Sequence, residues 1–226
     1  MNDISIVIPV YKEQPEFLER TYTELTAKGA EVIVVNDGDF VDLTFKHVAY
    51  RPQMGYGYAI KQGVKQATRK YVMTLDGDGQ HTIEDVLRLY KVLQIAPDFD
   101  MIVGMRYGLA EKPHRWLGRK ILNFIASIIA GHYLIDLNSG MRIFRRDLAL
   151  GYSPILCDTF SFTTSLSMAI IADGHRVFYF PITVKDRNFG KSRVRVVRDG
   201  LITLYYITWV GIAMRTRGLR NWLSGR

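Results

Sequence analysis

Apolar runs of strand length alternate with amphipathic segments of helix length through the first half of this chain. The apolar runs predict strands at residues 4–10, 31–35, 45–50, 71–75 and 100–105. The segments between them, with a proline start, glycine punctuation or a Thr82-x-x-Asp85 capping box, predict helices at 15–28, 55–67 and 82–95. Strands and helices that alternate at this spacing are typical of an α/β, Rossmann-like fold, in which helices cover both faces of a mostly parallel sheet.

The pattern changes after about residue 110. Residues 113–131 open as an amphipathic segment with three basic side chains and become almost wholly apolar, and residues 201–214 form a second apolar run flanked by arginines. Both runs are shorter than the roughly 18 to 20 apolar residues that span a bilayer. They are either core helices or helices that lie in a membrane interface, and the basic flanks favour the interface. We therefore expect one domain over 1–195, which includes the 113–131 helix, and a basic amphipathic helix and tail over 196–226.

Composition adds little to the fold, but the distribution of charge indicates a partner. The chain has 226 residues and a net charge of +8. Residues 185–226 carry ten Lys and Arg against two acids, whereas residues 1–184 carry twenty of each sign. Such a basic block is usually a solvated face, and its functional alternatives are an anionic membrane surface and a nucleic acid. Because aromatic residues are not interleaved with these basic residues, as a single-strand binder would prefer, the membrane is favoured and no nucleic acid is expected.

The single cysteine and the N-terminus favour a cytoplasmic location. Cys157 cannot form an internal disulfide, which fits a reducing compartment. The chain runs from Met1 directly into an expected strand, without the basic region and long apolar run of a signal peptide.

Polar residues follow three of the predicted strands where each strand ends. They are Tyr11 and Glu13, then Asp37, then Asp76 and Asp78. Strand ends on one edge of a parallel sheet meet in one crevice, so these side chains should converge. Asp76-Gly-Asp78 can present hard oxygen ligands to a divalent cation that also binds substrate phosphates. The alternative for this stretch alone is a tight turn, since Asp and Gly are common turn residues.

Other catalytic motifs fail on spacing. Gly190-Lys191-Ser192 lacks the glycine of a P-loop five positions earlier, where Lys185 stands. Gly55 and Gly57 open like a dinucleotide fingerprint, but Ile60 occupies its third glycine position, so these glycines and Gly63 are expected to serve turns and packing. The chain contains neither a His-Glu-x-x-His zinc motif nor a Gly-x-Ser-x-Gly nucleophile elbow.

Six motifs occur together and in order. They are Ile8–Glu13, Val35–Gly38, Asp76–Gln80, Gly104–Tyr107, Asp136–Arg142 and Asp186–Arg193. With them the chain resembles the family 2 glycosyltransferases of the GT-A fold, and most closely their dolichyl-phosphate mannosyltransferase-like, or polyprenyl-phosphate glycosyltransferase, branch. The resemblance covers about residues 4–195.

The resemblance implies a role for each matched residue. It places the nucleotide against Pro9, Tyr11, Glu13, Val35, Asp37, Asp76 and Gly77, and it assigns Mg²⁺ or Mn²⁺ to Asp78 and Gln80. It places Arg106, Arg187 and Arg193 near the donor diphosphate and the acceptor phosphate, with Arg115 more loosely aligned; these arginines and Asp78 are the candidate catalytic residues. Asp136 is expected to orient an arginine, and Ser139 and Gly140 to shape a loop under the sugar. Asn36 and Arg193 depart from the usual Asp and Lys.

The activity that the resemblance implies is metal-dependent, inverting transfer of a hexose to a polyprenyl phosphate of the dolichyl or undecaprenyl type. The donor would be of the GDP-mannose or UDP-glucose type, and the protein would lie peripherally on the cytoplasmic face of the membrane. One alternative is a family 2 enzyme that glycosylates a saccharide hydroxyl in polysaccharide or glycolipid synthesis, and another is an inactive membrane- or nucleic-acid-binding module. The base, the sugar, the acceptor, the oligomeric state and a membrane-anchoring partner subunit or additional membrane segment stay open.

Overall fold

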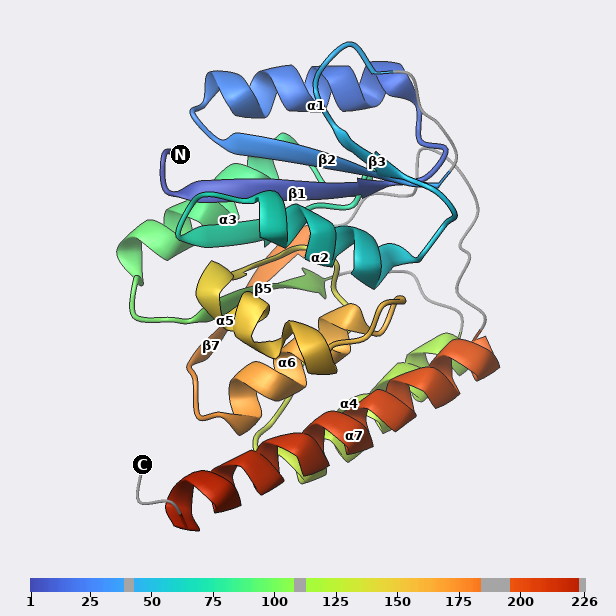
Figure 1. The fold of residues 1–226 in the computed structure, drawn as a ribbon, viewed down its shortest axis with the longest axis vertical. Coiled ribbons are helices and arrows are strands. Elements are labelled where there is room, and N and C mark those ends of the chain that lie inside the picture. The colour runs from blue at the N-terminus through green and yellow to red at the C-terminus, as the bar shows by residue number, and fades with distance from the viewer. Residues whose placement is uncertain (39–42, 108–112, 184–195, 224–226) are drawn as a thin grey trace.

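A seven-stranded mixed sheet forms the centre of the molecule, whose computed structural model describes residues 1–38, 43–107, 113–183 and 196–223 (Figure 1). The strand order is β3-β2-β1-β4-β6-β5-β7. The strands are β1 (Ile4–Val10), β2 (Glu31–Asp37), β3 (Val48–Tyr50), β4 (Tyr71–Thr74), β5 (Met101–Tyr107), β6 (Arg142–Arg145) and β7 (Val177–Thr183). Only β6 runs antiparallel to its neighbours, β4 and β5, so the expected mostly parallel sheet is confirmed.

Helices cover both faces because the central strands are apolar on both sides. On β1 and β2, Ile6 and Val34 join the buried cluster under one pair of helices, and Val7 and Val35 join the cluster on the opposite face. The first pair is α1 (Pro15–Ala27) and α3 (Ile83–Ile95). The other face carries α2 (Tyr56–Gln66), α5 (Arg146–Tyr152), the short η1 (Ser153–Ile155) and α6 (Phe162–Ala172).

The predicted elements of the first half are present with small differences in length. The first strand and the end of the third predicted helix at Ile95 are confirmed, and Thr82 caps α3 by accepting a hydrogen bond from the Asp85 N–H at 3.1 Å. The strand expected at 45–50 was too long, since only Val48–Tyr50 pairs with β2. The strand expected at 100–105 was placed too early, because pairing with β7 extends β5 to Tyr107.

Two long helices lie side by side along one end of the molecule, α4 (Pro113–Ala130) and α7 (Val196–Leu223) (Figure 1). They pack on each other and on α6, and the approach is close at Gly211, where an added Cβ would lie 2.4 Å from Ile129 Cγ2. None of the described helices is long and apolar enough to cross a bilayer. The separation of 1–195 from 196–226 stays a prediction.

Candidate active site

The carboxyl ends of β1, β2, β4 and β5 bring the predicted polar residues to one edge of the sheet. Pro9 and Val35 are direct neighbours across β1 and β2. Beyond β1 the chain turns through Lys12, whose φ of 68° is left-handed, and the carboxylate of Glu13 accepts a hydrogen bond from the Tyr11 N–H. The side chain of Val35 is fully buried in the core, so at this position only the backbone lies at the strand end.

Asp37 ends β2 and holds the start of α2. Its carboxylate accepts hydrogen bonds from the Met54 N–H at 2.8 Å and from the Gly55 N–H at 3.0 Å. Gly55 has a φ of 114°, a backbone conformation that favours glycine, so its expected role as a turn residue is confirmed. The structure therefore gives Asp37 a structural task in addition to the base contact that the sequence suggests.

Asp76 lies just beyond β4 among three other segments of the chain. Its Oδ1 accepts a hydrogen bond of 2.9 Å from the Tyr56 hydroxyl, and its Oδ2 lies 3.9 Å from His81 Nε2. A Cβ built on Gly140 would lie 2.2 Å from Oδ2, so the backbone of the 136–141 loop closes directly over the carboxylate. The Asp76 side chain is 29% exposed and borders a hollow of about 200 Å³ between α1 and the start of α3. The Asp76 carboxylate is therefore held by Tyr56 and Gly140 on one side and is open to the hollow on the other.

Asp78 is half-buried and lies two residues after Asp76 in the same loop. Its Oδ1 accepts a hydrogen bond from the Gln80 N–H at 3.1 Å, across Gly79 with a φ of 75°, so the loop holds residues 78 and 80 together. Carboxylate and amide oxygens are the ligand type that Mg²⁺ and Mn²⁺ prefer. Within the described ranges, no group of three or more His, Cys, Asp or Glu is close enough to hold a metal. A cation here fits Asp78 and Gln80 only if substrate oxygens and water complete its shell.

Arg106, near the end of β5, is held by Asp136 in a two-pronged ion pair. The guanidinium donates from Nε and Nη2 to the two Asp136 oxygens at 2.9 and 2.5 Å, and the Arg106 N–H donates to Oδ2 at 3.0 Å. Burial opposes ionisation of Asp136, but the hydrogen bonds and charge of Arg106 outweigh it and hold the pKa of this carboxyl below its usual value. The expectation that Asp136 orients an arginine is confirmed, and that arginine is Arg106.

Arg142 is a fully buried cation that packs against the 136–141 loop. It donates to the carbonyls of Leu137, Ser139 and Thr163 and to the Ser167 hydroxyl. Burial lowers its pKa to about 10, which still leaves the side chain charged at neutral pH. Because these acceptors belong to the 136–141 loop and to α6, Arg142 fixes the loop that carries Asp136 and Gly140.

Three of the predicted arginines cannot be placed. Arg187 and Arg193 lie outside the described residues, as does the side chain of Arg115 in α4. The described part of the site therefore joins Pro9, Tyr11, Glu13, Val35, Asp37, Asp76, Gly77, Asp78, Gln80 and Arg106 at one edge of the sheet. Sequence reasoning missed Tyr56 and the task of Arg142; Tyr56 stands inside the rejected glycine fingerprint, and only its place after a turn glycine hinted at a constrained position.

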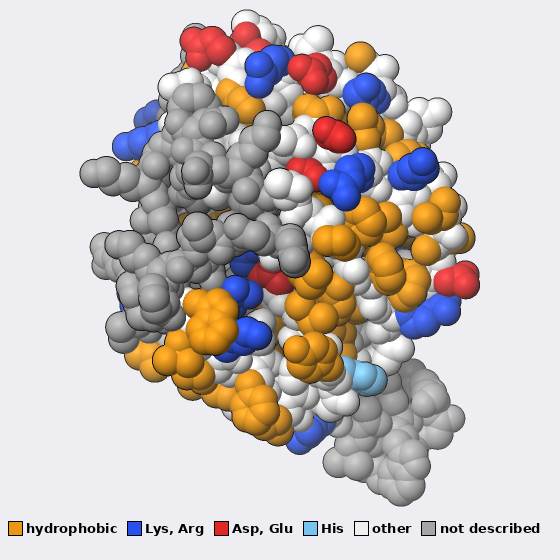
Figure 2. Space-filling view, turned by 180° about the vertical axis from the view of Figure 1, so that it is seen from behind, with side chains coloured by type: hydrophobic (Ala, Val, Ile, Leu, Met, Phe, Trp, Pro, Cys, Tyr) orange, Lys and Arg blue, Asp and Glu red, His pale blue; other side chains and the backbone are white. Residues whose placement is uncertain are grey.

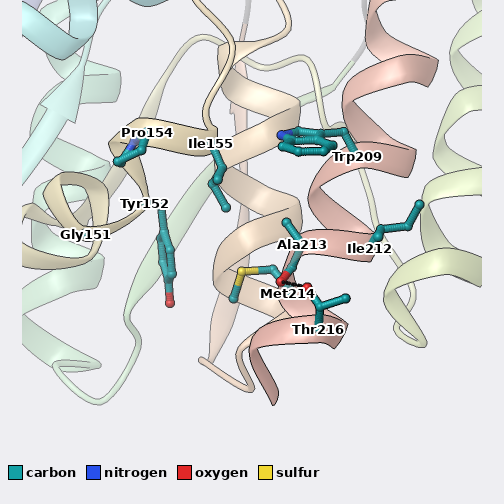
Figure 3. A pocket seen from close by; sticks show the side chains of 9 residues that line it. All are labelled: Gly151, Tyr152, Pro154, Ile155, Trp209, Ile212, Ala213, Met214 and Thr216. Carbon is teal, nitrogen blue, oxygen red and sulfur yellow. Dashed lines mark hydrogen bonds between the residues drawn. The ribbon is translucent and has the colours of Figure 1, made fainter. Parts of the chain in front are cut away.

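A larger hollow lies away from this edge. It has a volume of about 420 Å³ and lies between α7 and the end of α5, lined mainly by apolar side chains that include Trp209, Ile212, Met214 and Ile155 (Figure 3). None of its lining residues is charged. It therefore offers no charged side chain to neutralise a phosphate, and the sheet edge is the candidate active site.

Comparison with known proteins agrees with this location. The family model described as glycosyl transferase family 2 matches residues 5–151, which contain most of the described site. The chain is 27% identical over 233 residues to an undecaprenyl-phosphate 4-deoxy-4-formamido-L-arabinose transferase of Enterobacter sp. (strain 638), covering 91% of this chain but only 66% of that relative. It is also 27% identical to an undecaprenyl-phosphate mannosyltransferase of Micrococcus luteus, covering 95% of this chain and 96% of that one.

The fold is also found among solved structures. Glucosyl-3-phosphoglycerate synthase from Mycobacterium tuberculosis, solved in complex with Mn²⁺, UDP and phosphoglyceric acid, superposes with a TM-score of 0.75. The alignment covers 93% of this chain and 78% of that structure at 12% sequence identity. At that identity the similarity establishes the fold alone, which is the GT-A fold.

Proposed function

This chain belongs to glycosyl transferase family 2, and from that premise we propose that it transfers a hexose from a nucleotide diphosphate sugar to a polyprenyl phosphate at the cytoplasmic face of a membrane. The observation that carries the proposal is a single arrangement. The Asp76–Gln80 loop and the Arg106–Asp136 pair lie at the edge of the sheet where α4 and α7 begin, and each of these two helices carries a row of exposed apolar residues (Figure 1).

Each end of the reaction needs a different kind of group. Departure of the nucleoside diphosphate leaves negative charge on the leaving oxygens, and a divalent cation bound by Asp78 and Gln80 would neutralise it. A lipid phosphate is already largely ionised, so it attacks the sugar carbon without a general base. What the acceptor needs is a positive charge that aims it. Arg106, Arg187, Arg193 and Arg115 are proposed to supply that charge together, because guanidinium groups bind phosphate in two-pronged fashion and the charge of Arg106 is already balanced by Asp136.

The relatives support a lipid phosphate acceptor. Two of them are named as sugar transferases that act on undecaprenyl phosphate, and one of these matches the present chain over nearly its whole length. The solved relative binds Mn²⁺ and UDP, which supports a metal and a nucleotide sugar in the present site. The donor is proposed to be of the GDP-mannose or UDP-glucose type.

The surface of α4 and α7 supports contact with a membrane. Exposed apolar side chains recur every three or four residues on α4, at Leu117, Ile121, Phe124 and Ile128, and on α7, at Leu201, Tyr205, Trp209 and Ile212. Figure 2 shows hydrophobic side chains gathered beside Lys and Arg side chains at this end of the molecule. An apolar face beside basic residues suits an anionic bilayer surface. We propose that this face, which we call the apolar stripe, lies in the membrane interface, with or without a separate anchoring subunit.

Product formation tests the proposal. The full chain is incubated with Mn²⁺, a short-chain polyprenyl phosphate and, in turn, GDP-mannose, UDP-glucose and other nucleotide sugars. We expect one donor to yield a lipid-linked hexose in the organic phase and a chelator to abolish the yield. Lipid-linked product that forms equally well in the chelator would overturn the metal requirement, and transfer only to an added saccharide would overturn the acceptor.

A further inference from the structure

Tyr56 is a partly buried side chain at the candidate active site with no role so far. It is the first residue of α2, and its hydroxyl donates to Asp76 Oδ1 at 2.9 Å. Burial and the neighbouring charge of Asp76 raise the pKa of Tyr56 well above its ordinary value. The hydroxyl therefore keeps its proton over the whole physiological range and is a constant donor to a carboxylate, which is a strong type of hydrogen bond.

The backbone around Tyr56 is fixed from two directions. On one side, Asp37 accepts hydrogen bonds from the Met54 and Gly55 N–H groups. On the other side, the carbonyl of Asp158 accepts a hydrogen bond of 2.9 Å from the Tyr58 N–H. The first turn of α2 is thus held between the end of β2 and the loop before α6.

The ring of Tyr56 is held as well. It stacks on Phe160, with ring centroids 5.7 Å apart and planes inclined by 21°. Next to it, a Cβ on Gly57 would lie 2.3 Å from the Cys157 carbonyl, so α2 cannot shift toward this loop. A side chain fixed at its backbone and its ring presents its hydroxyl in one place, which is what a positioning group requires.

We propose that Tyr56 is a positioning residue for the nucleotide of the donor. Its hydroxyl fixes the rotamer of Asp76, and the segment 54–56 links that rotamer to Asp37, so the two acids at the ends of β2 and β4 act as one unit. The inference rests on the proposed function, because it takes Asp76 to face the nucleotide. Without the hydroxyl, Asp76 is free to turn toward His81 Nε2, which lies 3.9 Å away.

Tyr56→Phe tests this role with little change in volume. Nucleotide affinity is measured by calorimetry with UDP and with GDP in the presence of Mn²⁺. Loss of a hydrogen bond to a charged group predicts affinity weaker by about tenfold or more for the nucleotide that the unmodified protein binds. The matched control is Tyr58→Phe, which removes a hydroxyl from the same helix. The ring of Tyr58 packs edge-on against Tyr50. We expect the control to bind normally and both variants to melt close to the unmodified protein.

A double-mutant cycle with Asp76→Asn separates positioning from packing. If Tyr56 acts through Asp76, adding Tyr56→Phe to Asp76→Asn causes little further loss of nucleotide affinity. Additive losses, or normal nucleotide binding by Tyr56→Phe, would overturn the assignment while leaving the proposed function in place. If the unmodified protein binds neither UDP nor GDP, the donor half of the proposed function fails and the role of Tyr56 fails with it.

Discussion

Asp76 and Asp78 stand one residue apart, yet their surroundings suit them to different tasks. Asp76 is bound by Tyr56 and covered by the backbone at Gly140, whereas Asp78 is bonded within its own loop to the Gln80 N–H. A carboxylate that the protein already holds suits a directional contact with a substrate hydroxyl. A carboxylate on a short loop with an amide side chain nearby suits a cation. The spacing of the two acids predicted oxygen ligands for a divalent cation, but only the structure distinguishes their environments.

Asp78→Asn is predicted to abolish most turnover without unfolding the protein. An amide keeps the size of the side chain but removes the negative charge that a divalent cation requires. The measurement is lipid-linked product formed per minute with saturating Mn²⁺, beside the melting temperature of each variant. The control is Asp98→Asn, at an exposed acid on the surface, which should leave turnover unchanged. Full activity of Asp78→Asn would refute the metal assignment.

Asp136→Asn is predicted to lower the free energy of unfolding by about 3 kcal/mol at pH 7, because it leaves Arg106 without its buried counter-charge. The pKa of Asp136 is lower in the folded than in the unfolded chain. Its stabilising contribution is therefore complete above the unfolded pKa of about 4 and is lost as pH falls through the folded value. Denaturant titrations at pH 7 and pH 3 should show the difference between the two proteins shrinking at acid pH. An equal difference at both values would contradict this account.

Gly140→Ala is predicted to weaken nucleotide binding more than it weakens the fold. A Cβ at residue 140 would lie 2.2 Å from Asp76 Oδ2, so either the carboxylate or the loop must move. The comparison is Gly151→Ala, where nothing lies within 4 Å of the new methyl group. The affinity for UDP or GDP in the presence of Mn²⁺ should fall at least about tenfold in Gly140→Ala and should not change in Gly151→Ala. Equal affinities in the two variants would show that the closeness of Gly140 to Asp76 has no consequence for binding.

The helices and strands were predictable from the sequence where the hydrophobic period was clear, and they were not where that period was absent. The alternating runs up to residue 107 predicted five strands and three helices with small errors at their ends. No strand was predicted for β6, which has four residues and carries Arg142 and Arg145. The helix α6 was not predicted either. Ten of its eleven residues are buried, so it has no polar face that would reveal a helical period. Both β6 and α6 are determined by burial in the folded protein, which the local sequence pattern does not reveal.

The apolar stripe on α4 and α7 is predicted to bind vesicles. Phe124→Ser and Leu201→Ser replace side chains that are 67% and 64% exposed, so the fold loses little when they change. Flotation with vesicles that contain anionic lipid should recover less of each variant, and least of the double variant. The measurement is the fraction of protein that floats at a fixed lipid concentration.

The matched control for the stripe is Ile95→Ser at the end of α3. Ile95 is 75% exposed, more than either stripe residue, but it belongs to neither α4 nor α7. It tests whether any exposed apolar side chain has the same effect. Normal flotation of the stripe variants, or an equal loss in Ile95→Ser, would show that α4 and α7 do not contact the membrane.

In the whole molecule, the topology places the start of the apolar stripe at the same edge of the sheet as the candidate active site. The sequence predicted convergence at one sheet edge from the order of strand ends, which needs no knowledge of side-chain contacts. It did not predict that Asp37 anchors the helix carrying Tyr56, or that Arg142 joins the loop carrying Asp136 to α6, because the bonds from Asp37 to Gly55 and from Arg142 to Thr163 join residues far apart in the chain. α4 and α7 begin at the same edge of the sheet as the Asp76–Gln80 loop, which suits the proposed lipid acceptor (Figure 1).

A competition between acceptors tests whether the protein transfers the sugar to a lipid phosphate. The full chain is given Mn²⁺, its radiolabelled donor, and equal amounts of a short-chain polyprenyl phosphate, the matching polyprenol without phosphate, and a simple saccharide. The label in each product is then counted, and the mass of the lipid product is determined. We predict label almost entirely in a species whose mass equals that of polyprenyl phosphate plus one hexosyl residue, which is a hexose less one water. Label that enters the polyprenol or the saccharide at a comparable rate would contradict the account, because a hydroxyl would then be a sufficient acceptor.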